Sequence, residues 1–312
     1  MSKVLITGGA GFIGSNLADC LVKANDHIVI VDDFSMGLRS NIPDSQLITT
    51  YQADITDKVF MKDLLLNEHF DYYIYMFAGI ASVSDSVVRP YETHQTNQEA
   101  NIYLLEVLRK YHLPVKKVLF ASSAAVYGNN PQLPKIETSP IDPLTPYAID
   151  KFATERYLMD YGRLYDIPTV ATRFFNIYGP KQNPSSPYSG VLSIISDCIK
   201  HDKVFKLYGD GQQVRDFVYI DDVIDALILL TKESDINHEV FNVAAGKGTT
   251  LNDMIHAYEH AAGKNLQIEH LPARTGDIKY SYADITKLRN LGFQPHYDIE
   301  SGIAKYWHYL NQ

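Results

Sequence analysis

A glycine-rich turn between a short apolar strand and an amphipathic helix is the feature that most constrains this chain. Residues 7–14 read TGGAGFIG; they follow the β-branched run 4–7 and open a segment, 12–24, with apolar residues at helical spacing. Glycines at positions 8, 11 and 14 permit a tight turn, a close approach of the backbone to a pyrophosphate, and close packing of helix on strand. The N-terminus of the helix then offers N–H groups to phosphate oxygens. The sequence therefore predicts a dinucleotide site at this turn.

An acidic residue at the end of the next strand supports this interpretation. Asp32 follows the apolar run 28–31, about 20 residues beyond the turn, where a carboxylate accepts hydrogen bonds from a ribose diol and repels a 2′-phosphate. The pattern favours NAD over NADP. Asp33 is either a cofactor contact or a solvent-exposed side chain, and Asp54 with Ile55 either lies near an adenine edge or forms an ordinary turn before a helix.

Strand-like and helix-like segments alternate through the first half of the chain. We expect strands at 4–7, 28–31, 47–51, 72–77, 117–121 and 169–173, and helices at 12–24, 58–67, 91–111 and 146–165. Such alternation, with short strands that are hydrophobic on both faces, predicts an α/β fold of the Rossmann type: a doubly wound parallel sheet covered by helices on both faces.

Beyond residue 173 the alternation ends. Gly-Pro, Asn-Pro and Ser-Pro pairs between 179 and 187 indicate irregular connections. We expect helices at 191–200, 221–231 and 251–262 and strands near 206–208, 217–219 and 240–243. These predict a smaller, mixed α/β C-terminal domain formed by 174–216 and 246–312, beside a first domain of 1–173 with a returning segment near 217–245.

Composition excludes several classes of partner. The net charge of −9 is spread along the chain, which argues against nucleic acid and anionic membranes because both require a basic face. Two cysteines far apart in sequence suggest a reducing compartment, and the first apolar run stops after three residues, so we expect no signal peptide and a cytoplasmic protein. His256 and His260 share one helical face, but no third ligand is placed, and no metal site is expected.

Tyr147 and Lys151 are four residues apart on a predicted helix and so share one face. The pair becomes specific through Ser123, which ends the preceding strand at the edge where doubly wound folds bind ligands. A phenol titrates near 10, and we expect the Lys151 cation and an oxidised nicotinamide to lower the pKa of Tyr147. Ser123 can donate to a substrate oxygen or pass its proton to Tyr147. These residues predict removal of a hydroxyl proton while hydride leaves for a nicotinamide.

Several further motifs make the chain resemble the extended short-chain dehydrogenases/reductases, and within them the NDP-sugar 4-epimerases. The resemblance is nearly end to end, and it includes TGGAGFIG, FAG (77–79), SSAAVYG (122–128), the Tyr147/Lys151 pair, RFFN (173–176), GDG (209–211), RDF (215–217) and RTGD (274–277). It implies oxidation of a UDP-sugar at carbon 4 by bound NAD, a 4-keto intermediate that presents its other face, and return of the hydride. The cofactor need not leave.

The resemblance also implies roles for individual residues. Ser123, Tyr147 and Lys151 would be catalytic. Cofactor contacts are expected from the two catalytic residues Tyr147 and Lys151 and from Gly8, Gly11, Phe12, Ile13, Gly14, Asp32, Asp33, Ser35, Asp54, Ile55, Phe77, Ala78, Gly79 and Asn97. Substrate contacts are expected from Ser123, Asn176, Val191, Tyr208, Arg215, Arg274, Asp277 and Ser281. Resembling enzymes dimerise through the helices equivalent to 91–111 and 146–165, which implies a homodimer, although packing within one chain would give these helices the same composition.

Two departures bear on substrate and affinity. Ser281 stands where a bulky Tyr blocks N-acetylated sugars in resembling enzymes, so we expect UDP-GlcNAc/UDP-GalNAc to be accepted alongside, or in preference to, UDP-Glc/UDP-Gal. Ala81 stands where some hexose epimerases place a Lys near the phosphates, so affinity would depend more on Arg215 and Arg274.

Three alternatives stay open at this stage. An NDP-sugar 4,6-dehydratase would need the Asp-Glu pair that follows the strand-end residue in resembling dehydratases, whereas this chain has Ala124-Ala125. A UDP-uronic acid 4-epimerase, or a decarboxylase, differs by as little as one pocket residue. A non-catalytic NAD-sensing protein on the same scaffold would be expected to lose the Tyr/Lys pair, which is kept here.

Overall fold

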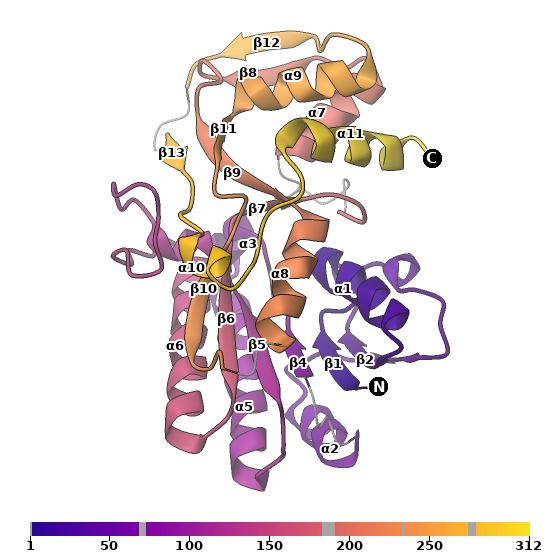
Figure 1. Cartoon of the computed structure of the whole chain (residues 1–312), viewed down its shortest axis with the longest axis vertical. Coiled ribbons are helices and arrows are strands. Elements are labelled where there is room, and N and C mark those ends of the chain that lie inside the picture. The colour runs from indigo at the N-terminus through magenta and orange to yellow at the C-terminus, as the bar shows by residue number, and fades with distance from the viewer. Residues whose placement is uncertain (1, 69–72, 183–190, 233–234, 274–278) are drawn as a thin grey trace. The chain divides into compact units, whose positions relative to one another are not determined.

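The computed structural model describes residues 2–68, 73–182, 191–232, 235–273 and 279–312 (Figure 1). The chain divides into two compact units: unit 1 comprises Met1–Asn130, Pro140–Phe174 and Ile224–Phe241, and unit 2 comprises Pro131–Ser139, Phe175–Val223 and Asn242–Gln312. The returning segment of unit 1 is thus shorter than the expected 217–245. The reason is that β9 (Val214–Tyr219) pairs with strands of unit 2. Pro131–Ser139 joins unit 2 because Lys135 bridges to Ala283.

Unit 1 is built on a seven-stranded sheet in the order β10-β6-β5-β4-β1-β2-β3. Its strands are β1 (Lys3–Thr7), β2 (His27–Asp32), β3 (Ile48–Gln52), β4 (Tyr73–Met76), β5 (Lys117–Ser123), β6 (Thr169–Phe174) and, at the edge, β10 (Glu239–Val243). Neighbouring strands are parallel in the pairs β3–β2, β2–β1, β1–β4, β4–β5 and β5–β6. The predicted Rossmann-type sheet is confirmed, and the strand order reverses between β1 and β4, where such folds bind ligands.

The helices of unit 1 connect these strands. They are α1 (Phe12–Lys23), α2 (Lys58–Glu68), α3 (Val83–Val88), α4 (Pro90–His94), α5 (Ala100–Tyr111), α6 (Pro146–Tyr165) and, continuing from unit 2, α8 (Ile220–Lys232). The single helix expected over 91–111 is interrupted by a π-helical turn at Gln95–Glu99. Short 3₁₀ turns occur at Arg39–Asn41 and Ala124–Tyr127.

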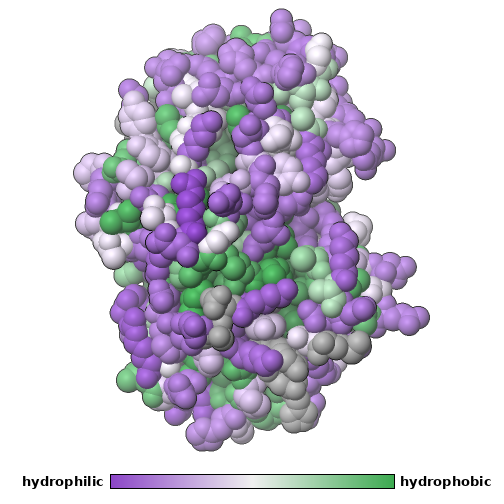
Figure 2. All heavy atoms as spheres, viewed as in Figure 1, coloured by the Kyte–Doolittle hydropathy of each residue, from purple (hydrophilic) through white to green (hydrophobic). Residues whose placement is uncertain are grey.

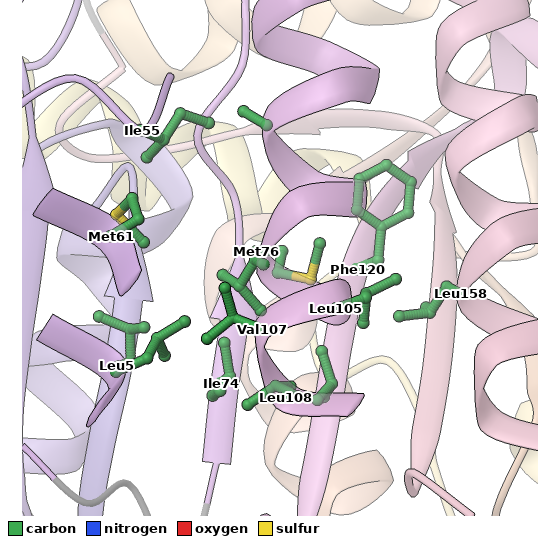
Figure 3. Packing of buried hydrophobic residues seen from close by; sticks show 14 of the residues in the cluster. Leu5, Ile55, Met61, Ile74, Met76, Leu105, Val107, Leu108, Phe120 and Leu158 are labelled. Atoms are coloured by element: carbon green, nitrogen blue, oxygen red, sulfur yellow. The ribbon is translucent and has the colours of Figure 1, made fainter. Parts of the chain in front are cut away.

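The main core of unit 1 lies between the sheet and α2, α5 and α6. Leu105 and Leu108 of α5 and Leu158 of α6 point toward Ile74 of β4 and Phe120 of β5, and all five are buried (Figure 3). Burial of such side chains contributes about 1.5–3 kcal/mol each. On the opposite face of the sheet, α8 is tied to β4 by a hydrogen bond from the Tyr75 hydroxyl to Thr231 Oγ1 (3.0 Å).

Unit 2 has a four-stranded sheet in which β9 pairs with β7 (Asn176–Tyr178), β11 (Gly248–Thr250) and β13 (Tyr280–Ser281). A two-stranded sheet joins β8 (Phe205–Tyr208) to β12 (Ile268–Leu271). Its helices are α7 (Val191–Lys200), α9 (Leu251–Ala262), α10 (Thr286–Arg289) and α11 (Ile299–Leu310). The mixed α/β character expected for the second domain is present, and the lone Trp307 packs edge-on against Tyr258 with ring centroids 6.3 Å apart.

Hydrophilic residues cover most of the face of the molecule seen in Figure 2. Among the described residues, no helix combines the length and the apolar character needed to cross a lipid bilayer.

Candidate active site

The glycine-rich turn leads into α1 as the sequence predicted, and its backbone leaves no room for side chains. Gly8 has a φ of +74°, and a Cβ there would lie 2.6 Å from the Ala78 nitrogen. A Cβ at Gly14 would collide with the Gly8 carbonyl oxygen. The first turn of α1 has neither a capping side chain nor an acidic residue. Its N-terminus is therefore suited to a phosphate group.

A pocket of about 590 Å³ opens beside this turn, entirely within unit 1. Ten of the predicted cofactor residues line it: Gly8, Gly11, Asp32, Asp33, Ser35, Asp54, Ile55, Phe77, Ala78 and Gly79. They come from the ends of β1, β2, β3 and β4, which meet at one edge of the parallel sheet. Phe12, Ile13 and Gly14, in the first turn of α1, are not among the lining residues, and neither are Asn97, Tyr147 and Lys151.

Asp32 is fixed at the end of β2 by main-chain donors. The Ala10 N–H donates to Oδ2 and the Phe34 N–H to Oδ1, each at 2.9 Å. Burial raises the pKa of this carboxyl, and the two N–H donors oppose that rise. A carboxylate has about four acceptor positions, so two of them stay available to a diol.

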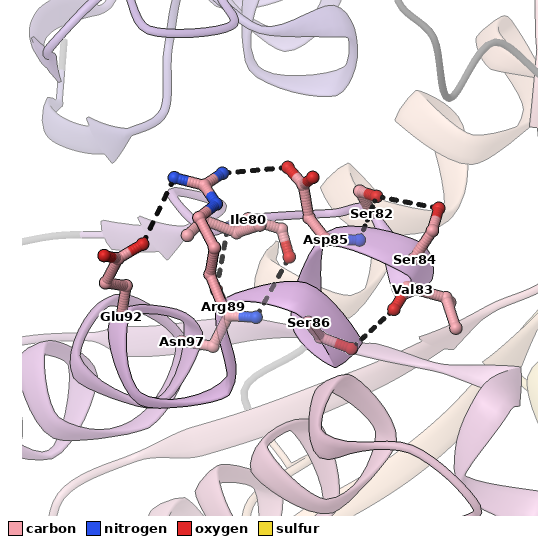
Figure 4. Close-up of polar contacts among 9 residues, drawn as sticks. All are labelled: Ile80, Ser82, Val83, Ser84, Asp85, Ser86, Arg89, Glu92 and Asn97. Carbon is pink, nitrogen blue, oxygen red and sulfur yellow. Dashed lines mark hydrogen bonds and ion pairs between the residues drawn. The ribbon is translucent and has the colours of Figure 1, made fainter.

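The far wall of the pocket was not predicted from the sequence. Arg89 forms ion pairs with Asp85 (2.9 Å) and with Glu92 (3.4 Å), and all three residues line the pocket (Figure 4). Ser82 caps α3 by accepting a hydrogen bond from the Asp85 N–H (2.9 Å). The sequence signal for these ion pairs is that Asp85 lies four residues before Arg89 and Glu92 three residues after it. Such spacings are common on any exposed helix and carry little specificity.

Asn97 lies at the centre of the π-helical turn and is fully buried. Its side chain accepts from the Ile80 N–H (2.7 Å) and donates to the Ile80 carbonyl (3.0 Å), which holds the loop after β4 in place (Figure 4). Its main-chain carbonyl accepts from Thr154 Oγ1 of α6 (3.1 Å) and from Asn101 Nδ2 (3.0 Å). The π turn therefore links the pocket wall to α6.

The structure brings Ser123, Tyr147 and Lys151 to one place. Ser123 is the last residue of β5, and Tyr147 and Lys151 lie one turn apart near the start of α6, whose first turn is capped by Thr145. The Lys151 Nζ is 5.8 Å from the centroid of the Tyr147 ring and donates to the Ala121 carbonyl oxygen (2.8 Å). A Cβ built on Gly79 would lie 3.7 Å from this Nζ. The ammonium of Lys151 therefore lies directly behind the pocket wall formed by Gly79.

The electrostatics of the trio differ from the sequence expectation. Burial raises the pKa of the Tyr147 phenol rather than lowering it, and only the Ser123 hydroxyl acts in the opposite direction. Burial also lowers the pKa of Lys151 to about 8. In the protein alone burial is the larger effect, and the ammonium donates to a main-chain carbonyl instead of the phenol. The lowering of this pKa by Lys151 together with an oxidised nicotinamide stays a prediction.

A buried ion pair holds α6 against the sheet next to the trio. Glu155, one turn beyond Lys151, accepts from both Arg173 Nε (3.0 Å) and Nη2 (2.6 Å). Ser122 Oγ, adjacent to Ser123, donates to the same carboxylate (2.7 Å), and Arg173 Nη1 donates to the Tyr127 hydroxyl (2.9 Å). All four residues are buried. Sequence reasoning listed Arg173 only as part of a motif and did not identify this network.

Apart from Ser123, which lies in unit 1, the predicted substrate residues that the structure describes lie in unit 2. Asn176 begins β7, and Arg215 lies on the neighbouring strand β9, where its Nη1 donates to the Val214 carbonyl (2.9 Å). Ser281 of β13 pairs in register with Arg215. Tyr208 ends β8, and Val191 begins α7. Arg274 and Asp277 lie outside the described residues.

The side chains and main-chain groups of unit 1 fit a dinucleotide. The glycine turn leaves space where a Cβ would clash, the helix N-terminus accepts a diphosphate, and Asp32 offers acceptors for a ribose. Fold and site together define a dinucleotide-dependent enzyme of the short-chain dehydrogenase/reductase type.

Comparisons with known proteins agree with this classification. Residues 4–244 match the NAD dependent epimerase/dehydratase family, and the chain belongs to it. It is 36% identical over 310 residues to a UDP-glucose 4-epimerase of Mycolicibacterium smegmatis, covering 97% of this chain and 96% of the relative. The predicted resemblance to nucleotide-sugar 4-epimerases is confirmed, and the chain is an NAD-dependent isomerase of this type.

Two solved structures are similar over almost their whole length. The UDP-glucose 4-epimerase of Thermotoga maritima with UDP-glucose has a TM-score of 0.92 and 34% identity, covering 99% of this chain and 98% of that one. The UDP-N-acetylglucosamine 4-epimerase of Methanobrevibacter ruminantium in complex with UDP-N-acetylmuramic acid has a TM-score of 0.92 and 35% identity, with the same coverage.

Proposed function

We propose that this protein interconverts UDP-Glc and UDP-Gal, and also UDP-GlcNAc and UDP-GalNAc, at carbon 4. One observation carries the proposal: the ammonium of Lys151 lies directly behind the Gly79 wall of the dinucleotide pocket, with the Tyr147 ring and the Ser123 hydroxyl beside it. A hydroxyl-bearing carbon placed there would lie between a proton acceptor and a hydride acceptor.

NAD, when bound, supplies the group that accepts the hydride from carbon 4 and returns it to the other face. The glycine turn and the start of α1 would hold its diphosphate, and Asp32 its ribose hydroxyls. Tyr147 would remove the proton of the 4-hydroxyl and later return it, with Ser123 holding the sugar oxygen by a hydrogen bond. Lys151 would favour the phenolate through its positive charge, which must offset the burial that raises the pKa of Tyr147.

The range of sugars is argued from unit 2. Arg215, with Arg274, would neutralise the diphosphate of the substrate, and Asn176 and Asp277 would add hydrogen bonds. Ser281 is small and next to Arg215 in the β-sheet, which supports room for an N-acetyl group. The similarity to both a UDP-glucose and a UDP-N-acetylglucosamine 4-epimerase supports the same range.

The purified protein should be incubated separately with UDP-Glc, UDP-GlcNAc and UDP-glucuronic acid, without added cofactor, and the products separated by chromatography. We expect the carbon-4 epimers of the first two. A product from UDP-glucuronic acid alone would replace the proposal with a uronic acid epimerase, and a 4-keto-6-deoxy product would indicate a dehydratase. No product even with added NAD would contradict catalysis on these substrates.

We infer a cytoplasmic homodimer that joins through α4, α5 and α6. Exposed apolar side chains on these helices support the interface: Tyr91 is 70% exposed, and Ile149, Tyr157 and Leu164 of α6 are 51%, 46% and 71% exposed. The α6 residues recur every seven or eight positions and share one helical face. Two free cysteines, Cys20 and Cys198, support a reducing compartment.

A further inference from the structure

A fully buried carboxylate lies next to a proposed substrate residue on β9. Asp216 is 0% exposed and directly follows Arg215 in this strand. Because successive side chains of a strand point to opposite faces of the sheet, β9 carries a partly exposed guanidinium on one face and a buried carboxylate on the other. Burial of a carboxylate is costly unless hydrogen bonds compensate it, so the role of Asp216 follows from its partners.

The partners of Asp216 are main-chain N–H groups from two other segments of unit 2. Its Oδ1 accepts from the N–H of Ala245 (2.8 Å), and its Oδ2 accepts from those of Gly246 (3.1 Å) and Ala283 (3.2 Å). Ala245 and Gly246 lie in the turn between β10 and β11, where Gly246 has a φ of +72°. Successive N–H groups of a turn can bind a single anion. Asp216 therefore joins β9 both to this turn and to the segment that follows β13.

Strand β13 carries another of the proposed substrate residues. It consists of Tyr280 and Ser281 and pairs with β9, with Ser281 opposite Arg215 (Figure 1). Strands usually have about 3–10 residues, so a pairing this short needs support from outside the strand. The hydrogen bond from the Ala283 N–H to Asp216 provides this support two residues beyond Ser281.

The opposite side of the segment after β13 is held by Lys135. The Lys135 N–H donates to the Tyr282 carbonyl (2.9 Å), and the Lys135 carbonyl accepts from the Asp284 N–H (2.8 Å). The segment is thus bonded to Lys135 on one side and to Asp216 on the other. Of these two attachments, the one through Asp216 leads to β9.

We propose that Asp216 is a positioning residue of the substrate site, which keeps the strand of Ser281 beside Arg215. This inference rests on the proposed function, in which Arg215 binds the diphosphate of a UDP-sugar and Ser281 lies next to it. Replacing Asp216 by Asn preserves the volume of the side chain but turns one acceptor oxygen into an NH₂ group that faces N–H donors. The attachment of β13 to β9 would then weaken, and the register of Ser281 with Arg215 would loosen.

The first test is amide hydrogen exchange without substrate, followed by mass spectrometry of overlapping peptides. In the natural protein the N–H of Ala283 should exchange slowly, and fast exchange there would overturn the proposal even if the variant does not fold. In Asp216→Asn we expect residues 279–284 to exchange about tenfold faster, as the loss of one hydrogen bond to a charged group implies.

The matched control is Asp222→Asn. Asp222 is also 0% exposed and accepts main-chain hydrogen bonds from His296 (2.7 Å) and Tyr297 (3.2 Å), none of which is a proposed substrate residue. In this variant the faster exchange should occur around residues 296–297 and not at 279–284. Equal exchange at 279–284 in the two variants would mean that Asp216 has no specific hold on β13.

The second test separates substrate binding from chemistry. We expect Asp216→Asn to raise KM for UDP-Glc and UDP-GlcNAc about tenfold with kcat unchanged, because a contact with the diphosphate contributes equally to the ground state and the transition state. Asp222→Asn should keep the natural KM. An unmoved KM in Asp216→Asn, a fall in kcat alone, or equal changes in the two variants would overturn the proposal. Faster exchange at 279–284 in a protein inactive on every UDP-sugar would support the role of Asp216 and refute only the proposed function.

Discussion

Tyr147 combines two properties that conflict in a general base. Its hydroxyl must lose a proton near neutral pH, yet burial raises the pKa of the phenol. Two groups can resolve this conflict: the Ser123 hydroxyl, which already acts to lower that pKa, and the Lys151 ammonium 5.8 Å from the ring centroid. The base is thus assembled from three side chains.

Replacing Tyr147 by Phe removes only the hydroxyl and should preserve the packing of α6. We expect kcat to fall by about 100-fold to 10,000-fold, because proton transfer by a positioned side chain contributes that much. Tyr157→Phe, on an exposed part of the same helix, is the control and should retain full turnover. Initial rates with UDP-Gal measure both, and turnover of Tyr147→Phe within a few fold of the natural enzyme would refute the assignment.

Lys151 should make the stability of the protein depend on alkaline pH. Its pKa is about 8 in the folded chain and 10.5 when unfolded, so between these values the unfolded chain holds the proton more tightly. The free energy of unfolding therefore rises with pH across this window, by about 1.4 kcal/mol per unit.

Lys151→Met lacks this titration. From pH 7.5 to 9.5 the natural protein should gain about 2 kcal/mol of unfolding free energy relative to the variant, measured by urea denaturation. Parallel pH dependences in the two proteins would show that the ammonium is not desolvated.

At the scale of elements, α6 is the part on which the site depends. Glu155 ties it to β6 through Arg173 and to β5 through Ser122. Breaking one partner of a buried ion pair leaves the other charge uncompensated. Glu155→Gln should therefore lower the free energy of unfolding by about 3–5 kcal/mol, as measured by denaturant titration.

A partly exposed ion pair provides the comparison. Glu106 binds Arg109 on α5 at 2.6 Å, and Glu106→Gln should cost no more than about 1 kcal/mol because solvent screens the pair. Equal losses in the two variants would mean that burial of Glu155 is not what strengthens its contact.

The same elements show what sequence could predict. The observed bounds of α6 agree with the predicted ones, and in the structure Thr145 caps the helix and Pro146 stands at its first position. The parallel sheet was predicted from the alternation of strands and helices, whereas the order of its strands was not predicted. The strands β7, β11, β12 and β13 were not predicted, since runs of two to four residues have no readable periodicity. The π turn was missed because its residues fit a regular helix equally well.

Local chemistry was harder to predict than location. The ten lining residues were predicted from the glycine turn, from the acidic residues after the strands and from the resemblance to the family. The rise in the pKa of Tyr147 was not predicted, because it depends on how deeply the ring is buried and on which acceptor binds the Lys151 ammonium. Both are decided by packing between β5 and α6.

At the scale of the whole molecule, the proposed dimer makes one simple prediction. Leu164 is 71% exposed on α6, and Leu164→Glu would place a charge in the proposed interface. We expect the dimer to dissociate at least about tenfold more readily, since burying an unpaired charge costs more than 1.4 kcal/mol. Sedimentation velocity at micromolar concentration measures this.

Val59→Glu is the control for the dimer. Val59 is 65% exposed on α2, which is not one of the proposed interface helices, and its replacement should leave the oligomeric state unchanged. A natural protein that sediments as a monomer, or two variants with the same behaviour, would exclude the interface through α6.

The wide turn at Gln95–Glu99 has a consequence for how this chain can vary. Such a turn holds one residue more than the regular spiral around it, and here the surplus residue lets the carbonyl of Asn97 reach Thr154. Deleting any single residue between 95 and 99 would restore a regular α-helix and rotate the residues N-terminal to the deletion by about 100° about the helix axis. His94, whose Nδ1 lies 3.0 Å from Oδ1 of Asp150 on α6, would then turn away from that carboxylate. The register between the two helices therefore tolerates substitution far better than a change in length.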